Sequence, residues 1–95
     1  MLSQEPINLD KVKEEDLDKE ILRLGMIAEL DAVSLYEQLA AKTKDKDIKK
    51  VLLDIAKEEK THISEFETLL LQRDKEQVRE SQKAREEIKK LTGKN

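Results

Sequence analysis

Residues 21–40 read ILRLGMIAELDAVSLYEQLA, and residues 52–71 read LLDIAKEEKTHISEFETLLL. In both stretches the apolar residues recur every three or four positions, which is the period of an amphipathic α-helix. A polar break, TKDK at 43–46, separates the two stretches. The pattern predicts two long antiparallel helices joined by a tight turn, the first over about 14–42 and the second ending near Arg73.

Capping residues support these boundaries and predict a third helix. Asp45 or Asp47 can accept the backbone N–H groups that begin the second helix. Asp74 can do the same for a helix over 75–91, and Gly93 just beyond it suits a helix C-cap. Because this third helix has few apolar residues and many charged ones, we expect it to pack lightly on a neighbour or to reach toward another subunit.

The chain is short and rich in charge, which limits its function. It has 95 residues, of which 43% are charged and 2% aromatic, with no cysteine and a net charge of −3. The lack of cysteine excludes disulfides and thiolate metal sites, and the interspersed charges argue against a nucleic-acid partner. No stretch is apolar for long enough to span a membrane, and none resembles a signal peptide, so a cytoplasmic location is expected.

The expected fold class is all-α, with three segments. We assign a flexible N-terminal arm to 1–13, a helical hairpin to 14–73 and a charged C-terminal helix to 74–95. A domain of this size buries only about 60–65% of its surface when it is alone. We therefore expect the hairpin to associate with a further copy into a four-helix bundle.

The first helix carries two neighbouring apolar stripes, which together make a wide apolar face. The Leu17–Leu39 stripe consists of Leu17, Ile21, Leu24, Ala28, Leu35 and Leu39. The Leu22–Ala40 stripe consists of Leu22, Gly25, Val33, Tyr36 and Ala40. The second helix has one apolar face, formed by Ile48, Val51, Leu52, Ile55, Ala56, Ile63, Phe66, Leu69 and Leu70.

Two carboxylates and a histidine interrupt these apolar faces. Glu29 lies in the Leu22–Ala40 stripe, and Glu59 lies in the apolar face of the second helix, with His62 three residues later. An unpaired buried carboxylate costs roughly several kcal/mol. The whole stability of so small a domain is about 5–10 kcal/mol. Ion pairing, protonation or a bound cation must therefore compensate.

The register of the hairpin brings the three side chains to one level. In an antiparallel hairpin that turns at 43–46, two residues at the same level have residue numbers that add up to about 89. The residue numbers of Glu29 and Glu59 add up to 88, and those of Glu29 and His62 add up to 91. One Glu and one Glu-x-x-His are half of the ligand set of a di-iron carboxylate site in a four-helix bundle. Oxygen and nitrogen ligands suit iron or manganese better than calcium. A two-fold dimer would supply all four Glu and two His.

Simpler interpretations exist for each of these residues. Glu29 and Glu59 can pair with lysines of a partner chain, and His62 can be an ordinary core histidine. Tyr36, seven residues after Glu29, is either a core tyrosine or a residue whose hydroxyl orients a metal-bound carboxylate or water. Three further acids near the site are either solvated surface or a weak acidic antechamber that concentrates Fe²⁺. These acids are Asp31, Glu58 and Glu65.

The stretch from Ile21 to Arg73 resembles the ferritin-like superfamily, and within it the encapsulated ferritins. The resemblance rests on Glu29, on Tyr36 seven residues later and on the Glu-x-x-His motif thirty residues after Glu29. It implies a hairpin with a C-terminal helix, dimerisation around a ferroxidase centre and assembly into a ring-like decamer. By position it makes Glu29, Glu59 and His62 the iron ligands, with Tyr36 beside them.

The resemblance also implies a partner and a location. Members of this family act inside encapsulin nanocompartments, which they reach through a C-terminal tail or by fusion to the shell protein. Nothing after Leu91 resembles such a tail, so we expect a truncated chain or one half of a fusion. Ala28 stands where some members have a further acid, which weakens the case for a strong acidic antechamber.

The expected function is a ferroxidase that oxidises Fe²⁺ to Fe³⁺ for iron storage in such a compartment. One alternative is a structural or adaptor hairpin in which Glu29 and Glu59 form interchain ion pairs. Another is rubrerythrin-like peroxide reduction, against which the missing cysteines argue because a self-contained rubrerythrin carries a rubredoxin-type iron.

Overall fold

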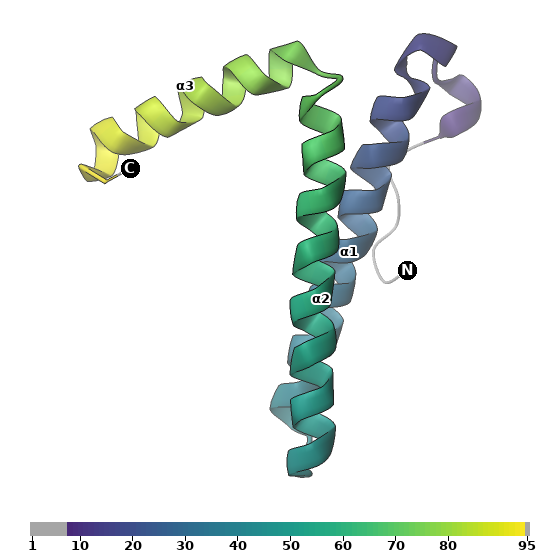
Figure 1. Cartoon of the computed structure of the whole chain (residues 1–95), viewed down its shortest axis with the longest axis vertical. Helices are drawn as coiled ribbons and strands as arrows, with labels where there is room; N and C mark the ends of the chain where they lie inside the picture. Colours follow the sequence, from purple (N-terminus) through teal and green to yellow (C-terminus); the bar gives the residue numbers. More distant parts are fainter. Residues whose placement is uncertain (1–7, 95) are drawn as a thin grey trace.

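Two long antiparallel helices form the body of the molecule, and a third projects from one end (Figure 1). The computed structural model describes residues 8–94, and within them the fold is all-α, as predicted. Helix α1 spans Leu17–Lys42, α2 spans Lys46–Leu71 and α3 spans Lys75–Thr92. Residues 8–94 contain no helix with the length and apolar character of a transmembrane span.

The predicted capping residues begin and end the helices. Asp45 starts α2, because its Oδ1 accepts the backbone N–H groups of Asp47 at 2.9 Å and Ile48 at 3.0 Å. Asp74 starts α3 by accepting the N–H of Gln77 at 3.0 Å. Gly93 ends α3 in the left-handed region, with φ of 71°. Local chemistry is therefore enough to divide this chain into its helices.

Two boundaries differ slightly from those predicted. The α-helical part of α1 starts at Leu17 because Glu14–Asp16 form a separate 3-10 turn, and α2 ends at Leu71. Apolar periodicity does not distinguish a single 3-10 turn from the first turn of an α-helix. Within the predicted arm over 1–13, Leu9–Lys11 form another 3-10 turn, and residues 1–7 lie outside the described residues.

The core of a single chain is small. Among the described residues the buried apolar side chains are Leu22, Ala40, Ala56 and Leu70. Helix α2 thus covers the Leu22–Ala40 stripe of α1, whereas no residue of the Leu17–Leu39 stripe is buried. The radius of gyration is 16.7 Å, compared with about 13 Å for a compact domain of 100 residues. One chain alone is an open, L-shaped assembly of helices (Figure 1).

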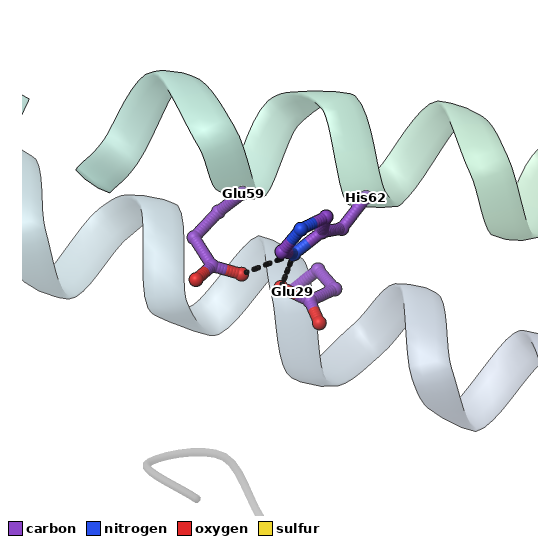
Figure 2. A group of neighbouring side chains, drawn as sticks. All are labelled: Glu29, Glu59 and His62. Carbon is purple, nitrogen blue, oxygen red and sulfur yellow. Dashed lines mark hydrogen bonds and ion pairs between the residues drawn. The ribbon is translucent and has the colours of Figure 1, made fainter. Parts of the chain in front are cut away.

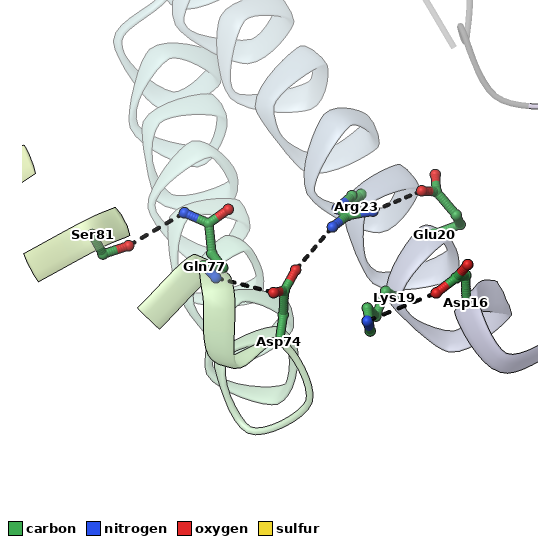
Figure 3. Close-up of polar contacts among 7 residues, drawn as sticks. All are labelled: Asp16, Lys19, Glu20, Arg23, Asp74, Gln77 and Ser81. Atoms are coloured by element: carbon green, nitrogen blue, oxygen red, sulfur yellow. Dashed lines mark hydrogen bonds and ion pairs between the residues drawn. The ribbon is translucent and has the colours of Figure 1, made fainter. Parts of the chain in front are cut away.

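An ion-pair network fixes the bend between α2 and α3 (Figure 3). Arg23 of α1 places Nη2 2.9 Å from Asp74 Oδ2 and Nη1 2.7 Å from Glu20 Oε1. The hydrogen bond from the Gln77 N–H, aided by the charges of Lys19 and Arg23, lowers the pKa of Asp74 although the residue is buried. The Asp74 carboxylate therefore joins α1 to α3, and the Asp74 backbone N–H donates to the Leu70 carbonyl of α2 at 2.9 Å.

Candidate metal centre

The side chains of Glu29, Glu59 and His62 converge between α1 and α2 (Figure 2). His62 Nδ1 lies 3.3 Å from Glu59 Oε2 and 3.5 Å from Glu29 Oε2. One ligand atom from each residue lies within 4.8 Å of the other two. Within residues 8–94 no other group of three or more histidine, aspartate or glutamate side chains meets in this way. The three residues singled out by spacing are therefore close neighbours in space.

Helix geometry and a short turn bring the group together. Glu59 and His62 are three residues apart on α2 and so lie on one face of that helix. Glu29 comes from the middle of α1. Because only residues 43–45 connect the two helices, their register is fixed, and Glu29 reaches the level of the α2 pair.

The distances from His62 to the two carboxylates fit a shared small cation. Carboxylate oxygen and imidazole nitrogen bind a first-row divalent ion such as zinc at about 2.0–2.2 Å, so two donors at roughly 100–110° lie about 3.1–3.6 Å apart. The two separations from His62 Nδ1, 3.3 and 3.5 Å, fall in this range.

Ion pairs within residues 8–94 do not balance the charges of the two carboxylates. In residues 8–94 neither Glu29 nor Glu59 forms an ion pair with a lysine or arginine, and each contacts His62 instead. Lys60, next to Glu59, pairs with Glu37 of α1 at 2.9 Å. The adaptor alternative therefore depends entirely on charges from a partner chain.

One side of the group is open. The side chains of Glu29 and Glu59 are 21% and 19% exposed, and that of His62 is 47% exposed. Val51 and Leu69 precede and follow His62 by 11 and 7 residues, so they share its side of α2, and they are 59% and 42% exposed. Exposed apolar side chains thus lie on the same side of α2 as His62, about three and two helical turns away from it.

The remaining predicted residues lie around the group without belonging to it. Tyr36 is half-buried, and within residues 8–94 no hydrogen bond joins its hydroxyl to Glu29. Asp31 is half-buried, whereas Glu58 and Glu65 are exposed on α2. Roles for these four residues stay predictions.

A contact beside the group was not predicted. The sequence pattern places Gly25 and Phe66 on apolar faces, and in the structure the Phe66 ring packs directly against Gly25. The signal in the sequence is a glycine inside a long helix, where this residue is unfavourable. The residue numbers of Gly25 and Phe66 add up to 91, as do those of Glu29 and His62. Because the two pairs are four residues apart on each helix, they lie in adjacent layers of the hairpin.

Known proteins resemble this chain in sequence. The sequence pattern of the rubrerythrin family matches residues 20–92. A ferritin-like–encapsulin shell fusion protein from Pyrococcus furiosus is 53% identical over 95 aligned positions, which cover 98% of this chain and 28% of the fusion protein. The encapsulin nanocompartment cargo protein EncC from Myxococcus xanthus is 34% identical over 71 positions, covering 75% of this chain and 55% of EncC. The chain thus spans about a quarter and about half of these two relatives.

A solved structure resembles the whole chain. The crystal structure of the encapsulated ferritin domain from Pyrococcus furiosus matches with a TM-score of 0.85 and 50% sequence identity. The match covers 100% of this chain and 99% of that domain, so it includes the projecting α3 as well as the hairpin.

Proposed function

This chain belongs to the rubrerythrin family and, within the ferritin-like fold, to the encapsulated ferritins, and from that starting point we propose that it is a ferroxidase. In this proposal Fe²⁺ is bound and oxidised to Fe³⁺ at a di-iron site that two copies of the chain build together. The convergence of Glu29, Glu59 and His62 is the observation that carries the proposal.

One chain supplies half of the ligands. Di-iron carboxylate sites in four-helix bundles use a Glu from each of two helices and a Glu-x-x-His from each of the other two. The hairpin presents Glu29 from α1 and the pair Glu59 and His62 from α2. A two-fold axis beside the open side of the group would supply the same three ligands again and complete the set.

The surface around the opening supports this arrangement. Val51 and Leu69, on the same side of α2 as His62, are exposed in one chain. Single exposed apolar residues are ordinary, but several on one side of a helix suit an interface with a second copy. Packing a second hairpin there would bury this surface and close the open side of the ligand group.

The ligand types suit oxidation of iron. Carboxylates are hard anionic ligands that stabilise Fe³⁺ relative to Fe²⁺, whereas imidazole suits both ions. Iron held there can be oxidised by dioxygen or peroxide. Within the chain, Glu29 and Glu59 provide negative charge in a half-buried position, and His62 offers Nδ1 between them. Tyr36 would orient one of these carboxylates once the second copy is in place.

The wider biology follows from the shape of the chain and from its relatives. A helical hairpin encloses no space for mineral, so storage would depend on a surrounding shell. The names of both sequence relatives refer to an encapsulin. One is a fusion with the shell protein, and the other is a cargo protein. We infer a cytoplasmic encapsulin nanocompartment as the location and its shell protein as the partner, with the dimers arranged in a decameric ring.

An anaerobic Fe²⁺ titration tests the proposal, followed by admission of oxygen. The parent protein should saturate near one iron per chain and oxidise it rapidly. Glu59→Gln should abolish rapid oxidation, because in a two-fold site each substitution removes two ligands. Glu67→Gln is the matched control, since Glu67 is an exposed acid of the same helix outside the group. A parent that binds no iron above buffer, or a Glu59→Gln variant as fast as the parent, would refute the assignment.

A further inference from the structure

Helices α1 and α2 meet beside the metal group in a contact of Phe66 with Gly25. A Cβ atom added to Gly25 would lie 3.0 Å from two carbons of the Phe66 ring and 3.1 Å from a third. Carbon atoms in favourable contact are about 3.5–4.0 Å apart. The Phe66 ring therefore rests on the bare backbone of Gly25, and any other residue at position 25 must push it away.

Backbone conformation gives no reason for a glycine here. Gly25 lies inside α1, and the only glycine with positive φ in the described chain is Gly93. Glycine is the poorest helix former after proline. The close packing of the Phe66 ring is what distinguishes position 25 from its neighbours.

The contact lies one helical turn from the ligands on both helices. Gly25 precedes Glu29 by four residues, and Phe66 follows His62 by four. Residues four apart lie above one another on the same face of a helix. The distance between α1 and α2 at the Gly25–Phe66 contact therefore constrains the distance between Glu29 and His62 in the next layer.

We propose that Gly25 and Phe66 are positioning residues that set the separation of α1 and α2 at the metal group. Phe66 holds the helices apart by the thickness of its ring, and Gly25 allows the ring to lie against the backbone. This inference rests on the proposed function, because it assigns the spacing to the binding of iron. Ligands of a metal site must be held within about 0.5 Å of the productive geometry, and the 3.5 Å from His62 Nδ1 to Glu29 Oε2 spans the two helices.

Gly25→Ala adds the methyl group that the contact excludes. Moving the ring from 3.0 Å to an ordinary contact requires a displacement of a few tenths of an ångström, which is comparable with the tolerance of about 0.5 Å for a metal site. We expect Co²⁺, used as a spectroscopic probe for Fe²⁺, to bind Gly25→Ala about tenfold more weakly, at the low end of the 10–100-fold range for groups that support metal ligands. The visible absorption of bound Co²⁺ should also change, because it reports coordination geometry.

Three further variants separate positioning from a general effect on the helix. Ser34→Ala is the matched control, since it also introduces alanine into α1 but at an exposed position. It should leave Co²⁺ affinity and spectrum unchanged. Phe66→Leu alone should also weaken binding, because the spacer becomes thinner. The double variant Gly25→Ala with Phe66→Leu should regain most of the affinity and the parent spectrum, because the smaller side chain makes room for the methyl group.

The outcomes distinguish this inference from the proposed function. Parent-like Co²⁺ affinity and spectrum in Gly25→Ala, or a loss that the double variant does not restore, would overturn the positioning role. A parent protein that binds neither Co²⁺ nor Fe²⁺ would overturn the proposed function instead. In that case crystal structures of the metal-free parent and Gly25→Ala decide the spacing itself: an unchanged separation of Glu29 and His62 would refute the inference.

Discussion

Exposed Val51, on the His62 side of α2, allows a quantitative test of the proposed two-fold interface. Val51 lies on the same side of α2 as His62 and is 59% exposed in one chain. If a second hairpin covers this side, Val51→Ser removes apolar surface that dimerisation would bury. The substitution leaves the metal ligands in place, so it perturbs association separately from coordination.

The expected loss follows from the exposed fraction. Burying a whole valine side chain contributes about 1.5–3 kcal/mol. With 59% of Val51 still exposed, about 1–2 kcal/mol per chain remains to be gained on dimerisation. The two-fold axis doubles this to about 2–4 kcal/mol per dimer, which weakens the dimer by about 30-fold to several hundredfold.

Sedimentation equilibrium of the metal-free protein measures the monomer–dimer step directly. Leu53→Ser is the matched control, because Leu53 is 47% exposed but lies nine residues before His62, on the opposite side of α2. Leu53→Ser should leave the dimer dissociation constant within about twofold of the parent value, since scattered surface positions contribute little. Equal effects of the two substitutions, or no effect of Val51→Ser, would show that this face of the hairpin is not the interface.

Two further predictions concern single side chains. The hydrogen bond from Gln77 lowers the pKa of Asp74 below its ordinary value of 3.8. The ionised Asp74 carboxylate therefore stabilises the fold at neutral pH, and this stabilisation is lost as the pH falls through the lowered pKa. Asp74→Asn should therefore have a lower melting temperature than the parent at neutral pH, and the two melting temperatures should converge in acid. Circular-dichroism melting curves that differ by the same temperature at every pH would contradict this. Tyr36→Phe should keep the iron stoichiometry and slow oxidation by about 10–100-fold. If stopped-flow measurements give the same rate of iron oxidation for Tyr36→Phe and the parent, Tyr36 has no role in oxidation and is a core residue only.

The helices could be predicted because their determinants are local. Asp45, Asp74 and Gly93 act on backbone groups within a few residues, so the sequence alone locates the ends that they cap. The 3-10 turn at Glu14–Asp16 escaped prediction because its energy differs little from that of an α-helical turn. Local patterns thus define helices well and their terminal turns less well.

The candidate site could be predicted because a short turn converts sequence spacing into register. Glu29, Glu59 and His62 meet as expected once α1 and α2 are antiparallel. The contact of Phe66 with Gly25 could not be found in the same way, because it depends on how closely two helices approach. Periodicity identifies the face on which a side chain lies and contains no information about that distance.

The wide apolar face of α1 links the metal group to association of two chains. Helix α2 buries Leu22 and Ala40 of the Leu22–Ala40 stripe and leaves no residue of the Leu17–Leu39 stripe buried. Glu29 lies in the first of these stripes, yet its side chain is still 21% exposed. A ligand that α2 covers only in part is within reach of a second copy, so a cation bound by Glu29 would contact both chains. A cation that binds the dimer more tightly than the monomer must, by linkage, stabilise the dimer to the same extent. Under the proposed function, iron would therefore strengthen the association that completes its own site, and without a cation the carboxylates of the two chains would repel one another across the two-fold axis.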